Sequence, residues 1–113
     1  MGESSEAQWQ HNRLELHAVL IERETLRYTP AGIAVIDAVL QHASVQTEAG
    51  HPRQVAMNIA ARFAGDQAEK LAPLALGSRF RLRGFLAPRR KDSWQLRLHV
   101  TTFETDTDST QYC

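Results

Sequence analysis

The stretch RFAGDQAEKLAPLALG, residues 62–77, decides the fold, because no other part of this 113-residue chain has a pattern that predicts a helix. Apolar residues recur there at helical spacing, at Ala68, Leu71 and Leu74. Asp66 precedes them and belongs to the residue types that commonly cap a helix start. Pro73 limits the helix to about two turns, because proline has no N–H to donate inside a helix. We therefore expect one short helix within residues 62–75.

The segments on either side alternate apolar and polar residues with the period of two that strands show. Strands are expected from Asn12 onward and over residues 33–48, 54–61, 79–87 and 94–103. Turn signals separate the early strands at residues 29–32 and 48–52, where proline and glycine favour a tight reversal of the chain. Gly84 predicts a bulge or bend that lets a small barrel close.

Three strands, a short helix and two further strands form an order that points to one all-β domain. This is the order of the OB-fold, a five-stranded Greek-key barrel with one short helix between strands three and four. The main competing topology is an SH3-like barrel, which does not normally carry a helix at that point. We expect the domain to span residues 12–104, with disordered polar tails at residues 1–11 and 105–113.

The overall composition describes a small globular protein and not a generally basic one. Thirteen Lys and Arg balance thirteen Asp and Glu, so the formal net charge is zero. Cys113 is the only cysteine, which excludes an internal disulfide and agrees with a reducing compartment. The first residues lack the features of a secretory signal, and no stretch approaches the ~20 apolar residues that cross a bilayer. We expect a soluble protein of the cytoplasm without a membrane partner.

Positive charge is nevertheless concentrated near the C-terminus. Seven of the thirteen Lys and Arg residues lie between positions 79 and 97, against a single acidic residue, Asp92. Arginines on an outward strand face are often only solvated surface, but a cluster without neighbouring acids favours nucleic acid as a partner. Trp94 follows the cluster and has two possible roles. Its alternation with Leu96 indicates the core, whereas its place beside a loop indicates a platform that stacks a base.

Catalytic and metal-binding signatures are absent from the sequence. There is no phosphate-binding lysine loop, no nucleophile elbow, no zinc-protease motif and no dinucleotide fingerprint. No pair of histidines has the short spacing of metal ligands, so we expect neither a metal nor another cofactor. His51, at the tip of a predicted turn, is the one histidine that is a candidate for ligand contact. These observations predict a binding protein and not an enzyme.

Several short strings resemble the PriB family, the primosomal replication protein N of bacteria. They are NRL at residues 12–14, TPAGI at 29–33 and, most specific, HASVQTEAG at 42–50 followed by RQ at 53–54. Matches also occur at GSR of residues 77–79, GF of 84–85 and LH of 98–99. The resemblance covers residues 12–104 and leaves both tails outside.

The resemblance implies a homodimeric OB-fold protein of the replication-restart primosome, without catalytic activity of its own. Such proteins bind single-stranded DNA and the PriA helicase, stabilise and stimulate the helicase at stalled forks, and help to recruit DnaT for reloading of the replicative helicase. Five basic residues match positions where the family carries DNA-contacting residues: Arg27, Arg53, Arg89, Arg90 and Lys91. Together with Trp94 and His51, they make up the expected single-stranded-DNA site.

The sequence departs from the family pattern at the expected DNA-binding face. His51 and Ala56 stand where the family has an aromatic residue and a tryptophan, and Ala43 stands in place of a basic residue. These changes weaken base stacking and leave two alternatives open: a protein–protein adaptor with weak DNA binding, or an RNA-binding OB-fold protein. For the expected homodimer, the first strand offers apolar residues on both of its faces.

Overall fold

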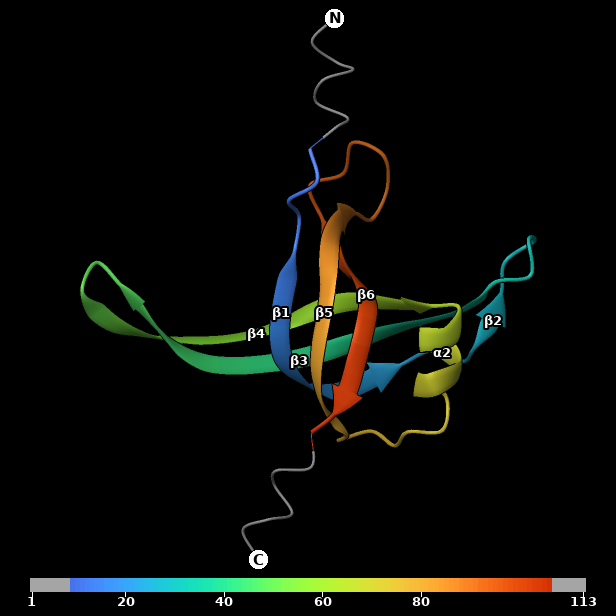
Figure 1. The fold of residues 1–113 in the computed structure, drawn as a ribbon, viewed down its shortest axis with the longest axis horizontal. Coiled ribbons are helices and arrows are strands. Elements are labelled where there is room, and N and C mark those ends of the chain that lie inside the picture. The colour runs from blue at the N-terminus through green and yellow to red at the C-terminus, as the bar shows by residue number, and fades with distance from the viewer. Residues whose placement is uncertain (1–8, 107–113) are drawn as a thin grey trace, which may run out of the picture.

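Six strands and one short helix make up residues 9–106, the part of the chain that the computed structural model describes (Figure 1). In chain order they are β1 (Leu14–Arg23), β2 (Arg27–Tyr28), β3 (Ala34–Glu48), β4 (His51–Ala64), α2 (Asp66–Leu71), β5 (Arg79–Pro88) and β6 (Leu96–Thr105). The five long strands and the helix follow the predicted order, which confirms the all-β class. β2 is a two-residue strand that the sequence did not predict, and it pairs with β3.

One strand closes the sheet into a barrel by changing partners. The strands are ordered β1-β5-β6-β4-β3-β2, and β1 also pairs with β3. Residues 14–19 of β1 run antiparallel to β5, and from Val19 onward the strand pairs with β3. On the other side of the barrel, residues 61–63 of β4 pair in parallel with β6. The result is the closed five-stranded barrel of the OB-fold.

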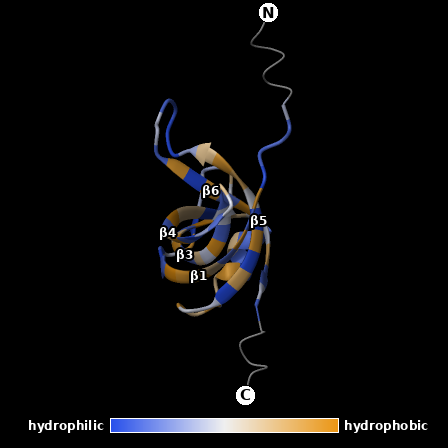
Figure 2. Ribbon diagram, turned by 90° about the vertical axis from the view of Figure 1, so that its left-hand side faces the viewer, coloured by the Kyte–Doolittle hydropathy of each residue, from blue (hydrophilic) through white to orange (hydrophobic). Residues whose placement is uncertain are grey.

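The barrel interior is filled by the residues that alternate inward along each strand (Figure 2). On β5, Phe80 and Leu82 are fully buried, while the arginines on either side of them face outward. Three phenylalanine rings meet in the interior with centroids 5.0–6.3 Å apart: Phe63, Phe80 and Phe103. Because burial of one such side chain stabilises a fold by about 1.5–3 kcal/mol, this aromatic cluster is a large part of the core.

The helix is shorter than predicted and begins later. Residues 62–64, which were expected to be helical, continue β4, because Phe63 is part of the barrel core. Gly65, with a φ of 64°, takes the N-cap position and Asp66 is already helical, so the predicted cap at Asp66 is wrong. The buried face of α2 packs against β3, β4 and β6.

The hairpin of β3 and β4 projects from the barrel along the longest axis of the molecule (Figure 1). Its strands pair continuously from Val35 with Ala64 to Glu48 with His51, so β4 is longer than the predicted strand at residues 54–61. The predicted turn at residues 48–52 is confirmed. Its two central residues both have positive φ, as two-residue hairpin turns require. The hairpin is therefore a fully hydrogen-bonded arm.

The predicted bulge at Gly84 is confirmed. The register of β5 on β6 shifts between Arg83 and Gly84, so that one residue of β6, Thr101, has no opposite neighbour. A Cβ atom on Gly84 would lie 2.0 Å from the backbone oxygen of His99, and only glycine fits this close approach. The bulge bends the two strands where the barrel closes.

The predicted domain ends lie close to the limits of the described residues. β6 continues to Thr105, one residue into the predicted C-terminal tail at residues 105–113. Most of both predicted tails, residues 1–8 and 107–113, lies outside the described residues, and their disorder stays a prediction. Within residues 9–106, no helix has the length and apolar character needed to span a bilayer.

Candidate nucleic-acid interface

The loop between β5 and β6, residues 89–95, carries the predicted basic cluster at one end of the barrel (Figure 1). Its backbone is closed by a hydrogen bond in which the Arg89 N–H donates to the Gln95 carbonyl at 2.8 Å. Three exposed cations of this loop form no ion pair with a described residue: Arg89, Arg90 and Lys91. The loop also contains one carboxylate, Asp92, so the three cations leave it with an excess of positive charge.

Trp94 lies in the same loop, with 96% of its surface exposed. β6 begins only at Leu96, and its first buried residue is Leu98, so the core alternative for Trp94 is wrong. Next to it, the Ser93 hydroxyl accepts the Gln95 N–H at 3.0 Å and holds the loop backbone. The indole is therefore open to stacking on a flat ligand beside the three loop cations.

The arginines on the outward face of β5 do not form the uniform positive surface that the sequence suggested. Arg81 pairs with Glu104 of β6 at 3.0 Å, and Arg83 pairs with Glu15 of β1 at 2.6 Å. The expectation of a cluster without neighbouring acids is wrong here, because both carboxylates come from strands that are distant in sequence. This face consequently carries less net positive charge than the loop.

A second group of cations surrounds Asp37 on β3. Arg62, directly opposite on β4, binds this carboxylate through two hydrogen bonds of 2.8 and 3.1 Å. Arg27 on β2, a predicted DNA contact, approaches the same carboxylate at 3.1 Å. Burial raises the pKa of Asp37, but the hydrogen bonds and charges of Arg62 and Arg27 together outweigh burial and lower the pKa below its ordinary value. The carboxylate is therefore a fixed negative centre that orients two arginines.

Asp37→Asn should lower the free energy of unfolding at neutral pH by about 1–3 kcal/mol, because Arg62 loses a charged partner in a half-buried position. The folded-state pKa of Asp37 lies below the unfolded one, so this stabilisation is complete above pH ~4 and is lost as the pH falls through the folded-state value. Urea unfolding of both proteins over an acidic pH series measures the difference. A difference in the free energy of unfolding that stays constant down to the lowest pH would contradict a stabilising ion pair at Asp37.

Asp37 lines a groove of about 200 Å³ between the end of β1, β3, β4 and the base of the loop. Its lining includes Arg89 from the loop and Arg97 from β6 as well as Asp37. The structure thus brings two predicted contacts, Arg27 and Arg89, to one side of the barrel. Arg62 and Arg97, which were not in the predicted set, join them there.

The remaining predicted contacts, Arg53 and His51, lie at the tip of the β3–β4 hairpin. Arg53 forms an exposed ion pair with Glu48 at 2.8 Å. Along the longest axis of the molecule, this tip and β2 lie at opposite ends (Figure 1). One chain therefore does not gather the seven predicted contacts into a single patch, but distributes them over the hairpin tip, the loop and the groove.

The most specific string of the sequence, residues 42–50, begins with a hydrogen-bonded chain. His42 is 8% exposed, and its Nδ1–H donates a hydrogen bond to the His17 carbonyl at 2.7 Å. Its Nε2 is hydrogen-bonded to the Ser44 hydroxyl at 2.8 Å, and the Gln46 amide donates a hydrogen bond to the same hydroxyl at 2.9 Å. These contacts join β1 to β3, so His42 and Ser44 have a structural role. Within residues 9–106, no three His, Cys, Asp or Glu side chains are grouped to hold a metal ion.

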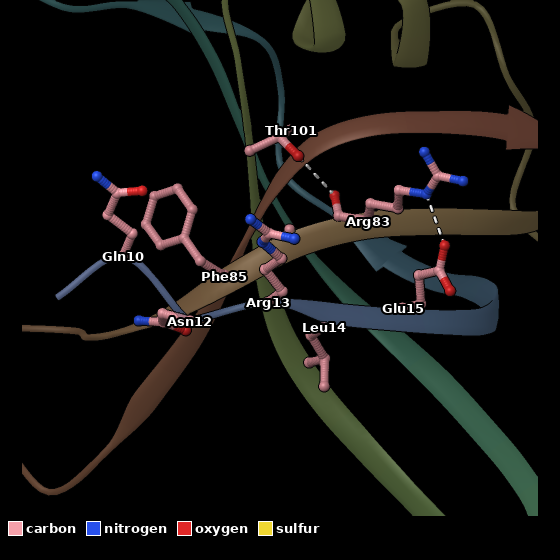
Figure 3. A pocket seen from close by; sticks show the side chains of 9 residues that line it. Gln10, Asn12, Arg13, Leu14, Glu15, Arg83, Phe85 and Thr101 are labelled. Carbon is pink, nitrogen blue, oxygen red and sulfur yellow. Dashed lines mark hydrogen bonds and ion pairs between the residues drawn. The ribbon is translucent and has the colours of Figure 1, made fainter.

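A larger cavity of about 670 Å³ lies beside β1 and β5, away from the predicted site residues (Figure 3). Its lining includes Arg13 and Phe85, and the Phe85 ring stacks on His99 with centroids 5.0 Å apart and an angle of 4°. Burial lowers the pKa of His99, and the charges of Arg62 and Arg97 lower it further. The stacked imidazole is therefore neutral at neutral pH.

Comparison with known proteins decides the family. The family model described as "another single-strand binding protein family" matches residues 12–102. The replication restart protein PriB of Bordetella pertussis is 46% identical over 89 residues, covering 79% of this chain and 83% of the relative. PriB of Neisseria meningitidis serogroup A is 39% identical over 94 residues, covering 82% and 93%. The chain belongs to the PriB family.

Solved structures agree with the PriB assignment. PriB from Ralstonia solanacearum superposes with a TM-score of 0.77 at 37% identity, over 86% of this chain and 100% of that chain. The single-stranded DNA binding protein of Thermus aquaticus gives a TM-score of 0.66 at 26% identity, over 84% of this chain and 50% of that chain. These similarities confirm the OB-fold and the PriB resemblance. The names of these relatives describe replication restart and DNA binding and not an enzyme.

The sequence did not predict a role for Arg62, Arg97 or Asp37 in this PriB family member. Arg62 fell in the segment that was predicted to be helical, and Arg97 was counted in the basic cluster without a role. A usable signal was Asp37, the one charged residue in the apolar run IAVIDAVL at residues 33–40. A charge in such a strand requires a partner, and a basic residue on an adjacent strand was the expected one.

Proposed function

We propose that this protein captures single-stranded DNA during replication restart and has no catalytic activity. The observation that carries the proposal is the loop at residues 89–95, where three cations without ion-pair partners among the described residues lie beside an indole that is 96% exposed. Cations hold phosphates, and an exposed indole stacks on an unpaired base, so the combination suits a single strand. The names of the relatives, replication restart protein and single-stranded DNA binding protein, support the proposal.

The proposed DNA contacts fall into three parts: the loop, the groove side of the barrel and the hairpin tip. The primary contact is the loop, with Arg89, Arg90, Lys91 and Trp94. Arg27 extends it along the groove side of the barrel, where its guanidinium is half exposed. Arg53 and His51, both exposed at the hairpin tip, form an outlying contact. A flexible strand can reach separate parts of this kind without a rigid geometry.

Trp94→Ala should weaken binding to an oligothymidylate at least about fivefold, because one stacked base contributes about 1–3 kcal/mol. The salt dependence should stay the same, since no cation is removed. Both proteins carry Trp9→Phe, so that Trp94 is the only tryptophan of the reference protein. Quenching of its fluorescence by the oligonucleotide reports stacking directly. Unchanged fluorescence at saturation would contradict the role of Trp94. If the reference protein, which keeps Trp94, does not bind the oligothymidylate at low salt, the proposed DNA binding itself is overturned.

We further propose that the protein binds the PriA helicase, stimulates it at stalled forks and helps to recruit DnaT in the cytoplasm. The PriB names of the relatives support this place in restart. Ala43 pairs with Ala56 in the middle of the hairpin, so neither a basic nor an aromatic side chain is available there. This favours a large share for protein contacts and keeps the adaptor function as a second candidate. The helicase role would be contradicted if addition of this protein did not change the rate at which PriA unwinds a forked DNA.

We also propose that two copies pair through β1. Residues 14–18 pair with β5 along one edge of the strand, and the opposite edge pairs with no described strand. An unpaired edge presents backbone N–H and C=O groups that a second strand can bond, and antiparallel pairing of two β1 strands gives a closed two-fold dimer. Sedimentation as a monomer at micromolar concentration would contradict this arrangement.

A further inference from the structure

Arg97 differs from Arg27 and Arg62 because no carboxylate forms an ion pair with it. It comes from β6, lines the groove of about 200 Å³ and is partly buried. Its guanidinium forms no hydrogen bond or ion pair with any described residue, whereas the guanidinium of Arg62 binds both oxygens of Asp37. The donors of the Arg97 guanidinium are therefore available to a ligand in the groove.

The charges that surround Arg97 are mostly of its own sign. Burial lowers the pKa of Arg97, and the charges of Arg62, Arg89 and Arg27 lower it further, against the one opposing carboxylate of Asp37. A partly buried cation among other cations is unfavourable when nothing accepts its hydrogen bonds. An anion in the groove would remove this cost.

More arginines than carboxylates lie in and around the groove. Its lining holds three arginines, Arg23, Arg89 and Arg97, and three carboxylates, Glu22, Glu24 and Asp37. Two further arginines, Arg27 and Arg62, do not line it but both bind Asp37. Asp37 is shared by two guanidiniums, and Glu24 is 3.8 Å from one of the same two. The groove and its surroundings therefore keep an excess of positive charge. This excess lies toward Arg89 and Arg97.

We propose that Arg97 and Arg89 form a binding site for one phosphodiester group of single-stranded DNA, reached by the strand as it passes from the loop into the groove. A guanidinium can donate two parallel hydrogen bonds to phosphate oxygens. The cavity is smaller than those that enclose a drug-sized ligand, so it suits a phosphate group and not a nucleotide. Arg62, held beside the groove by Asp37, adds positive charge. This inference rests on the proposed function and adds a contact outside the predicted set.

Arg97→Gln should weaken binding of a fluorescein-labelled oligothymidylate about 3–10-fold and flatten the log–log salt slope by about 0.7, the value for one phosphate contact on a single strand. Arg79→Gln is the matched control, because it removes the same charge from an exposed arginine at the other end of β5. It should change the affinity by less than about twofold, since its charge is screened at that separation. Thermal unfolding checks that both variants are folded.

Asp37→Asn tests the same site with the opposite sign. It removes a negative charge beside the proposed phosphate, so the folded variant should bind the oligothymidylate about threefold more tightly, although it is less stable than the wild type. A role of the arginine cluster in folding alone would instead give weaker or unchanged binding. The two variants therefore separate an anion site from a purely structural ion-pair network.

The outcomes distinguish this inference from the proposed function. Weaker binding by Arg97→Gln than by Arg79→Gln, with tighter binding by Asp37→Asn, supports the phosphodiester site. Equal binding by the two arginine variants, or weaker or unchanged binding by folded Asp37→Asn, overturns it while DNA capture by the loop stands. If the wild type does not bind the oligothymidylate at low salt, the proposed function fails, and this site fails with it.

Discussion

Simultaneous replacement of Arg89, Arg90 and Lys91 by alanine should lower the affinity for single-stranded DNA roughly 100-fold at moderate salt. The three side chains are exposed and have no ion-pair partner among the described residues, so they can each contact a phosphate. Each lost phosphate contact flattens the log–log salt slope by about 0.7, and the slope should therefore change by about 2. Fluorescence anisotropy of a labelled oligothymidylate over a salt series measures both quantities.

A matched triple variant separates a localised contact from the effect of net charge. It replaces the outward arginines of β5, Arg79, Arg81 and Arg83, by alanine and so removes the same three charges. Two of these arginines are paired with Glu104 and Glu15, so their contribution to the field around the protein is already reduced. The affinity of this control should fall less than about threefold. Equal losses in both triple variants would show that only the overall charge matters and would contradict a site on the loop.

Gly84→Ala should lower the free energy of unfolding by about 3 kcal/mol or more. The new Cβ atom would lie 2.0 Å from the His99 carbonyl oxygen and 2.9 Å from its carbon, and backbone atoms cannot rotate away as a side chain can. Relief requires separation of β5 from β6 at the bulge, next to the buried Leu98 and Leu82. For a domain of this size, the midpoint of thermal unfolding should fall by more than about 12 °C.

Gly50→Ala is the control for Gly84→Ala, because the two glycines constrain the chain in different ways. Gly50 has a φ of 80° at the hairpin tip and open space where a Cβ would lie. Its replacement should cost only about 1 kcal/mol, the strain of a left-handed backbone in a residue other than glycine. A Gly84→Ala protein that unfolds within a few degrees of the Gly50→Ala protein would contradict the close packing of the bulge.

The order of elements was predictable from the sequence because strand and helix periods are local properties. Along β5 the alternation of Phe80 and Leu82 with arginines identifies the strand and its buried face. Gly84 itself indicated the bulge. Boundaries were less accurate, because they depend on tertiary contacts. Phe63 belongs to the core cluster and keeps its neighbours in β4, although the local pattern there also suits a helix. Trp94 alternates with Leu96 in the sequence, but β6 begins only at Leu96, so Trp94 stays in the loop and is exposed.

The candidate site was predictable where it is local and was missed where it joins distant strands. The loop cations Arg89, Arg90 and Lys91 are consecutive, so their cluster is visible in the sequence. The pairs of Arg81 with Glu104 and of Arg83 with Glu15 depend on the strand register, which no local count of charges includes. In the same way, Asp37 and Arg62 are 25 positions apart and meet only because β3 and β4 pair.

The most direct test of the account is a titration of a fluorescein-labelled oligothymidylate of a few tens of nucleotides with the wild-type protein, at salt concentrations from low to physiological. Single-strand capture by the basic loop predicts saturable binding at low salt, and an affinity that falls linearly on a log–log plot with a slope of about −3, as expected for four or five phosphate contacts. A duplex competitor of the same length should displace the single strand poorly. No binding at the lowest salt, or an affinity that does not depend on salt, would contradict single-strand capture by the basic loop.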